Sequence, residues 1–211
     1  KLLHGLREDE RLEILHTDNG NPSIIAENLE PSEEITKTLV ETLSDGAVLS
    51  FGLESADTAV HEANWLNCDS AQLKTAIRLI NKYGATRGPR GLPKLLPGLN
   101  FIAGLNGETK QTYHKNFALL QDLRSENLLL RRINIRQVEG EGFQEIPQQE
   151  FNNFKQNVRD EIDKPLLQQL FPLGQILRSV HWESHGGRTR LPAHLGPEHT
   201  DQGCYGKAGI T

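Results

Sequence analysis

The stretch Leu96–Tyr113, LPGLNFIAGLNGETKQTY, decides the fold predicted for this chain. It opens with an apolar run typical of a buried strand and passes through a turn that contains Gly104 and Gly107. Glu108 and Thr109 follow, in positions from which side chains commonly cap the free N–H groups at the start of a helix. The stretch therefore predicts a strand, a tight turn and a helix. The glycines fit either a ligand that approaches the backbone closely or an ordinary turn.

The same alternation continues on both sides of this stretch. Strand-like runs cover 11–18, 47–54 and 128–138, and helical patterns cover 30–46, 55–84 (split near 64–70) and 109–127. The order β-α-β-α-β-α-β predicts a parallel sheet with right-handed crossovers. The α/β class then leaves two forms, an open doubly wound sheet or part of a closed (β/α) TIM-like barrel.

The pattern changes from about Pro147, which divides the chain into a partial barrel, 1–146, and a C-terminal extension, 147–211. One long polar helix, broken at Pro165, opens the extension, and an alternating strand at 174–185 and a loop-rich tail follow it.

Composition limits the classes of function. The chain has 211 residues and a net charge of −5, which argues against nucleic acid as the main partner. No apolar run approaches the roughly 20 residues that a membrane-spanning helix needs. Two cysteines, Cys68 and Cys204, suggest a reducing compartment, and we expect the cytoplasm. The chain begins at Lys1 and contains no methionine, so we expect it to be a piece of a longer protein.

Each predicted strand has one face that becomes polar toward its carboxyl end, where α/β proteins place their ligands. The residues concerned are His16, Asp18, Ser50, Gly52, Glu54, Asn100, Ile102, Gly104, Asn134 and the two arginines Arg132 and Arg136. A charge that is buried without a partner is costly, so such groups either pair with each other or serve a site. Glu54 with Arg132 or Arg136 would be an internal ion pair, and agreement among four strands favours a ligand site.

Three motifs, in this order and spacing, resemble the third to sixth βα units of radical S-adenosylmethionine (radical SAM) proteins: SFGLESAD at 50–57, LNFIAGLNGETKQT at 99–112 and RRINIRQV at 131–138. The resemblance is strongest to archaeal Fe–S oxidoreductases without an assigned role, and LHTDNGNP at 15–22 fits the same group. It covers about Leu12–Val138.

The resemblance implies an enzyme that cleaves S-adenosylmethionine (SAM) reductively on a [4Fe–4S] cluster. It also implies a set of SAM-binding residues. The ends of two strands would contact the ribose, methionine and adenine groups, and a polar strand would lie near the methionine carboxylate, which suits an arginine. The implied residues are Gly52, Glu54, Ser55, Ile102, Gly104, Gly107, Asn134 and Arg136.

The chain departs from that family in one large respect. The family holds its cluster with a CxxxCxxC motif, and neither Cys68 nor Cys204 belongs to such a motif. The first strand and the glycine-rich second strand of the family are also missing. We therefore expect an inactive fragment with no metal ligands of its own, whose sheet has an uncovered edge that favours self-association or a covering segment. The catalytic residues and the substrate are not readable.

Three other interpretations compete with this one. The first is a zinc site in the tail, formed by His181, His185, His194, His199 and Cys204. Their spacing is not that of known zinc-binding motifs, so solvated loop residues are favoured. A non-catalytic module for an anionic or nucleotide-like ligand could use the basic loop with Arg87, Arg90 and Lys94, where a solvated loop is favoured. A Rossmann site is set aside, because GLNGET is not G-x-G-x-x-G.

Overall fold

A computed structural model describes residues 2–138, 140, 143 and 145–178, together with the backbone of 183–185 and 188–190. The chain divides into two compact units, Lys1–Arg178 and Ser179–Thr211. The helices that follow residue 147 belong to the first unit, so the compact unit extends beyond the boundary that the sequence pattern indicated.

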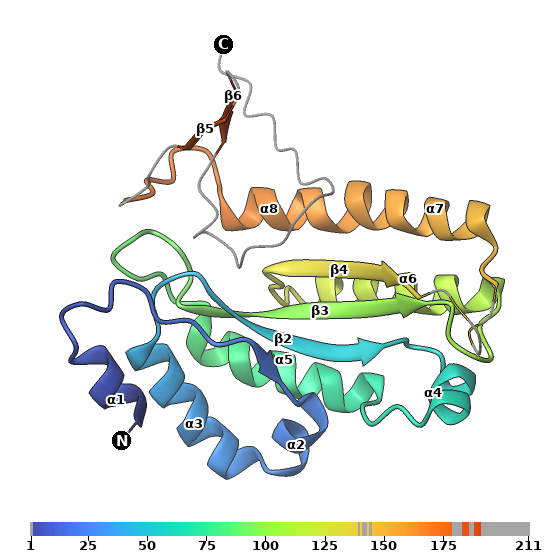
Figure 1. Ribbon diagram of the computed structural model, residues 1–211, viewed down its shortest axis with the longest axis horizontal. Coiled ribbons are helices and arrows are strands. Elements are labelled where there is room, and N and C mark those ends of the chain that lie inside the picture. Colours follow the sequence, from blue (N-terminus) through green and yellow to red (C-terminus); the bar gives the residue numbers. More distant parts are fainter. Residues whose placement is uncertain are drawn as a thin grey trace. The chain divides into compact units, whose positions relative to one another are not determined.

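The first unit is built on a four-stranded parallel sheet (Figure 1). Its strands are β1 (Asn19–Gly20), β2 (Ala47–Glu54), β3 (Leu95–Ala103) and β4 (Arg132–Gln137), and they lie side by side in chain order. The α/β class and the parallel pairing in chain order are thus confirmed.

Helices connect and cover these strands. Their bounds are α1 (Leu2–Arg7), α2 (Pro22–Glu27), α3 (Leu29–Thr42), α4 (Thr58–Asn64), α5 (Ser70–Gly84), α6 (Lys110–Ser125), α7 (Gln148–Asn157) and α8 (Lys164–Leu170), with a π-helical segment at Val158–Asp163 between the last two. The helix that was predicted to break at Pro165 continues through this residue, because the π-helical segment ends at Asp163 and Pro165 lies in the first turn of α8, where a proline is tolerated.

Capping residues fix where the two central helices begin. The Asp69 carboxylate accepts hydrogen bonds from the N–H groups of Ala71 and Gln72, both at 2.8 Å. At the start of α6, the N–H of Thr109 donates to the hydroxyl of Thr112 at 3.0 Å. These contacts satisfy backbone groups that a helix end otherwise leaves without partners.

One face of the sheet carries the hydrophobic core. Odd-numbered residues of β2 and β3, such as Phe51 and Phe101, are fully buried among residues from α5, α6 and α7. The Phe101 ring meets Phe154 of α7 edge-on at 6.0 Å, and Tyr113 of α6 lies 5.7 Å from Phe154. The aromatic contacts place α7 and α6 in the same helical layer, against the same face of β3.

One prediction about the N-terminal part is wrong in detail. The first strand was expected at 11–18, but only Asn19–Gly20 forms a strand. Residues before it run beside β2 without regular pairing, because Leu15 exchanges its backbone hydrogen bonds with the side chain and N–H of Ser44. Ile35 of α3 is 59% exposed, whereas Leu39 and Val40 of the same helix pack against the core.

The second unit contains a short antiparallel hairpin, β5 (Glu183–His185) with β6 (Arg188–Arg190). Of the strand predicted at 174–185, the structure has 183–185 in a strand and 174–178 outside one, and 179–182 lie outside the described residues. Among the described residues, no helix is both long and apolar enough to cross a lipid bilayer.

Candidate functional site

The sheet face opposite the core begins with the buried apolar pair Val48 and Leu96 and becomes polar toward the carboxyl ends of the strands, where its side chains form rows. Parallel register brings Ser50, Gly98 and Arg132 into one row, and Gly52, Asn100 and Asn134 into the next. Because neighbouring residues in register point to the same face, each row is one band of side chains. We call this surface the polar face.

The Arg132 side chain spans the first row. The Arg132 guanidinium donates from Nη2 to the Ser50 hydroxyl at 2.7 Å, which joins β4 to β2 over the top of β3. Gly98 makes this path open, since a Cβ at that position would lie 3.2 Å from Cγ of Arg132. Burial lowers the pKa of Arg132, and the nearby Asp18 carboxylate partly offsets this. The arginine nevertheless stays charged, because its ordinary pKa is so high.

The second row is held by two amides. Asn134 donates from Nδ2 to Oδ1 of Asn100 at 2.8 Å, and both side chains are partly buried. Gly52 stands beside Asn100 in register, and the Glu54 carboxylate occupies the space that a side chain at Gly52 would take. The row therefore brings two amides and a carboxylate together.

Glu54 closes the end of β2 in an unusual conformation. Its φ is +67°, and the N–H of Ser55 donates to the carbonyl of Leu53 at 2.8 Å, which makes a three-residue γ-turn with a positive central φ. This form of the turn is rare and strained. The register with β3 shifts at the same place, between Gly52 and Glu54, so a bulge ends the strand pairing.

The Glu54 carboxylate folds back over Gly52. A Cβ on Gly52 would lie 2.5 Å from Oε1 of Glu54, and Oε2 is buried without a hydrogen-bond partner among the described residues. Burial raises the pKa of Glu54, and Arg136 partly opposes this. Arg136 is exposed, and in the described part of the chain it forms no ion pair with Glu54 within 4.0 Å.

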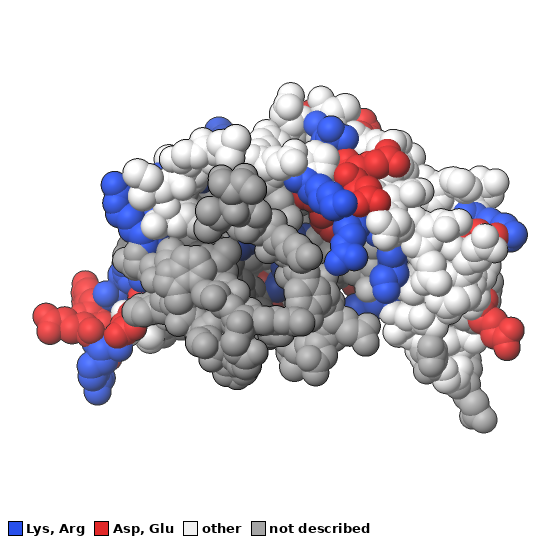
Figure 2. Space-filling model, turned by 90° about the horizontal axis from the view of Figure 1, so that it is seen from above, with Lys and Arg blue, Asp and Glu red and all other residues white. Residues whose placement is uncertain are grey.

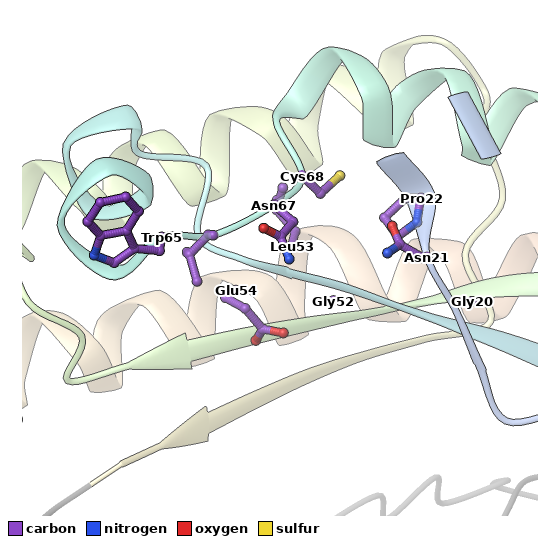
Figure 3. Close-up of a pocket in the computed structure, with 10 residues that line it drawn as sticks. Gly20, Asn21, Pro22, Gly52, Leu53, Glu54, Trp65, Asn67 and Cys68 are labelled. Atoms are coloured by element: carbon purple, nitrogen blue, oxygen red, sulfur yellow. The ribbon is translucent and has the colours of Figure 1, made fainter. Parts of the chain in front are cut away.

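A pocket of about 290 Å³ opens beside this carboxylate (Figure 3). Its walls are the end of β1 and the start of α2 at 20–22, the end of β2 at 52–54, and the segment 65–68 between α4 and α5. Figure 3 shows Trp65 at the end of α4, on the opposite side of the pocket from Asn21 and Pro22.

Some residues assigned by the resemblance lie on the polar face and others do not. Gly52, Ile102, Asn134 and Arg136 are on this face. The Glu54 carboxylate reaches it by folding back over Gly52. Ser55 is fully buried instead, where its hydroxyl lies 3.4 Å from Oδ1 of Asn116 on α6 and accepts the Asp57 N–H at 3.1 Å.

The glycine turn after β3 serves the fold in this structure. The buried Glu108 carboxylate accepts the Gly104 N–H at 2.6 Å, and burial raises the pKa of Glu108. Gly107 has φ +82°, and a Cβ there would lie 3.3 Å from the Ala59 carbonyl oxygen. The carboxylate and the two glycines therefore close a tight turn against α4.

Sequence reasoning did not single out the contact between Arg132 and Ser50 across Gly98, nor the Asn100–Asn134 pair. Alternation placed four of these residues on the polar faces of their strands, and Gly98 was not named: Ser50, Asn100, Arg132 and Asn134. Register between strands is the missing information, because it decides which polar residues of two strands stand in the same row.

The basic loop is largely tied to the fold. Arg87 donates to the carbonyls of Gly91 and Leu170 at 2.7 and 2.6 Å, and Lys94 pairs with the buried Asp45 at 3.1 Å. The loop was expected to be solvated, and these contacts anchor it to the rest of the fold. Figure 2 shows Lys and Arg beside Asp and Glu on the described part of the face in view, so charges of both signs mix there.

The zinc site that was considered for the tail falls on residues that the structure largely does not describe. The His and Cys residues of the tail lie outside the described residues, apart from the backbone of His185. Within the described part of the chain, no three His, Cys, Asp or Glu side chains gather as metal ligands would. Cys68 is buried, and burial raises the pKa of its thiol to about 12.

Comparison with known proteins finds long archaeal relatives. No family model matches the sequence. The chain is 42% identical over 186 residues to an uncharacterised protein of Archaeoglobus fulgidus, which covers 83% of this chain and 35% of that protein. It is 38% identical over 193 residues to an uncharacterised protein of Methanocaldococcus jannaschii, covering 87% and 36%. The chain thus spans about a third of the length of the curated relatives it matches.

Proposed function

We propose that this chain is part of the barrel of a radical SAM enzyme and that its polar face contributes to the SAM site. One observation carries the proposal. A parallel sheet in chain order has helices on one face and rows of polar side chains on the other, and the motifs that resemble the family end at these rows. Closed α/β barrels use that arrangement, with ligands at the carboxyl ends of the strands.

The residues on the polar face suit the groups of SAM. Arg136 is exposed at the end of β4, and a guanidinium matches a carboxylate such as that of the methionine moiety. Glu54 lies to one side of these rows, at the pocket between the ends of β1 and β2 and the segment 65–68. Ile102 stands in register with Arg136 and provides an apolar surface for the adenine ring.

The cluster does not fit the residues of this chain. A [4Fe–4S] cluster in this family supplies the electron that cleaves SAM and is held by three thiolates, whereas the sequence has two cysteines 136 positions apart (204 − 68). In the proposal, the residues of this chain bind and orient SAM and exclude water, and the cluster ligands come from the rest of a longer protein.

Binding of SAM is the first test. We expect the chain to bind SAM in equilibrium dialysis, and we expect Arg136→Ala to weaken binding about tenfold or more, as loss of a charge-assisted pair does. Arg7→Ala removes the same charge from the exposed helix α1 and should leave binding unchanged. Binding that Arg136→Ala does not affect would contradict the assignment of Arg136.

Cluster assembly is the second test. Anaerobic reconstitution with iron and sulfide should give no stoichiometric cluster and no 5′-deoxyadenosine with these 211 residues. The same treatment of the longer Archaeoglobus fulgidus relative should give both. If the relative forms no cluster but still binds a nucleotide or an anion, the non-catalytic binding module replaces the enzyme.

A further inference from the structure

The pocket beside Glu54 has a chemical character of its own. It lies between the ends of β1 and β2 and the segment 65–68, to one side of the rows that cross β2–β4. Among the residues that line it, Glu54 is the only one with a charged side chain. We propose that this pocket binds the protonated amine of a second ligand, with the Glu54 carboxylate as its counter-ion.

The Glu54 carboxylate is prepared for a partner that the described chain does not supply. Oε2 is buried and has no hydrogen bond, although an unpaired buried acceptor is costly. A strained turn and a bulge hold the residue at this spot, and backbone strain tends to persist where a site uses it. An ammonium group has three donors and a positive charge, so it would satisfy this oxygen.

The nearest competing cation is Arg136. It acts on Glu54 from a distance, but no ion pair within 4.0 Å joins them in the described part of the chain, and the arginine side chain is exposed. In the described part of the chain, Arg136 therefore forms no ion pair with Glu54 that a ligand amine would have to displace.

The remaining walls also favour a cation. Trp65 is 89% exposed at the pocket margin, and the face of an indole ring attracts ammonium groups. Cys68 brings no negative charge at neutral pH, because burial raises the pKa of its thiol to about 12. A volume of about 290 Å³ is at the lower end of ligand sites and suits a short alkyl chain that ends in an amine.

Amine recognition stands on these contacts alone, whereas the role of the amine as the enzyme's substrate rests on the proposed function. The two are separable by experiment, because the amine is tested without SAM. If SAM fails to bind while the amine binds, the proposed function falls and the amine site stands. If SAM binds and the amine does not, the amine site falls.

The test is a titration followed by ¹H–¹⁵N NMR, with n-butylammonium and with 1-butanol, a neutral molecule of similar size. We expect saturable shifts for the amides of Gly52 and Asn67 and for the indole N–H of Trp65, with affinity for n-butylammonium at least about tenfold above that for 1-butanol. Equal shifts from the two probes, or shifts that do not saturate, would overturn the proposal.

Two variants connect the binding to the carboxylate. Glu54→Gln keeps the shape of the side chain and should abolish the preference for n-butylammonium, whereas Glu62→Gln removes an exposed acid of α4 and should keep it. Gly52→Ala places a methyl 2.5 Å from Oε1 of Glu54, so it should push the carboxylate aside and weaken binding. An unchanged preference in Glu54→Gln overturns the proposal, and the NMR spectrum of each variant shows whether it is folded.

Discussion

The backbone at Glu54 yields the sharpest prediction from this structure. Its φ of +67° lies in the region that L-residues avoid, at a cost of about 1–2 kcal/mol, and glycine adopts it freely. Glu54→Gly removes this strain and the buried carboxylate, and it adds about 0.5–1 kcal/mol of unfolded-chain entropy. Glu54→Gln removes only the charge. We therefore expect the Gly variant to be about 1 kcal/mol more stable than the Gln variant.

Urea unfolding followed by circular dichroism measures this difference. In a chain of this size, 1 kcal/mol also corresponds to about 2–4 °C in the midpoint of thermal unfolding. Glu62, within helix α4, is the matched control. There the Glu62→Gly variant should be less stable than Glu62→Gln by about 1 kcal/mol, because helix interiors disfavour glycine. If Glu54→Gly is also less stable than Glu54→Gln, the inference of strain is wrong.

Three further predictions concern the core and the C-terminal helices. Gly84→Ala should lower the free energy of unfolding by about 3 kcal/mol or more and lower the urea midpoint, because a methyl at the end of α5 would overlap the backbone carbonyl oxygen of Leu95. A backbone carbonyl in a strand cannot rotate away as a side chain can. Phe154→Ala should cost about 3–5 kcal/mol and make α7 more sensitive to limited proteolysis, since the ring packs against Phe101. Burial raises the pKa of Asp163 to about 6, so the stability that its protonated form contributes is complete below about pH 4 and is lost as pH rises through 6. Asp163→Asn should therefore gain about 2–3 kcal/mol relative to the natural chain between pH 4 and 7.5, and a gap that stays constant across this range would show that the carboxyl is not perturbed.

The sheet was predictable because its signals are local. Apolar alternation, glycine turns and caps such as Asp69 mark where strands and helices begin, and parallel pairing in chain order follows from the alternation of the two. The first strand was missed for a reason that lies outside those signals. Ser44, distant in sequence, takes the backbone hydrogen bonds of Leu15, so an apolar run that reads as a strand remains irregular.

The candidate site was predictable only as a list of residues on a face. Glu54, Asn134 and Arg136 were placed there by alternation, and the structure brings them to one face. Ser55 shows the limit of that reasoning, because the turn at Glu54 interrupts the alternation and directs the next side chain into the layer against α6. A positive φ in a non-glycine residue has no sequence signal, since its cause is the tertiary surroundings.

The two glycines of the polar face have a common explanation in these contacts. Neither Gly52 nor Gly98 has a positive φ, so backbone freedom does not require them. Each lies instead beneath a charged side chain: the Glu54 carboxylate covers Gly52, and the Arg132 side chain crosses Gly98 on its way to Ser50. A larger residue at either position would lift that charge off the sheet and break a short contact. Glycine in the middle of these strands thus fixes where one negative and one positive group lie on the polar face, which is the property that a ligand with both charges would recognise.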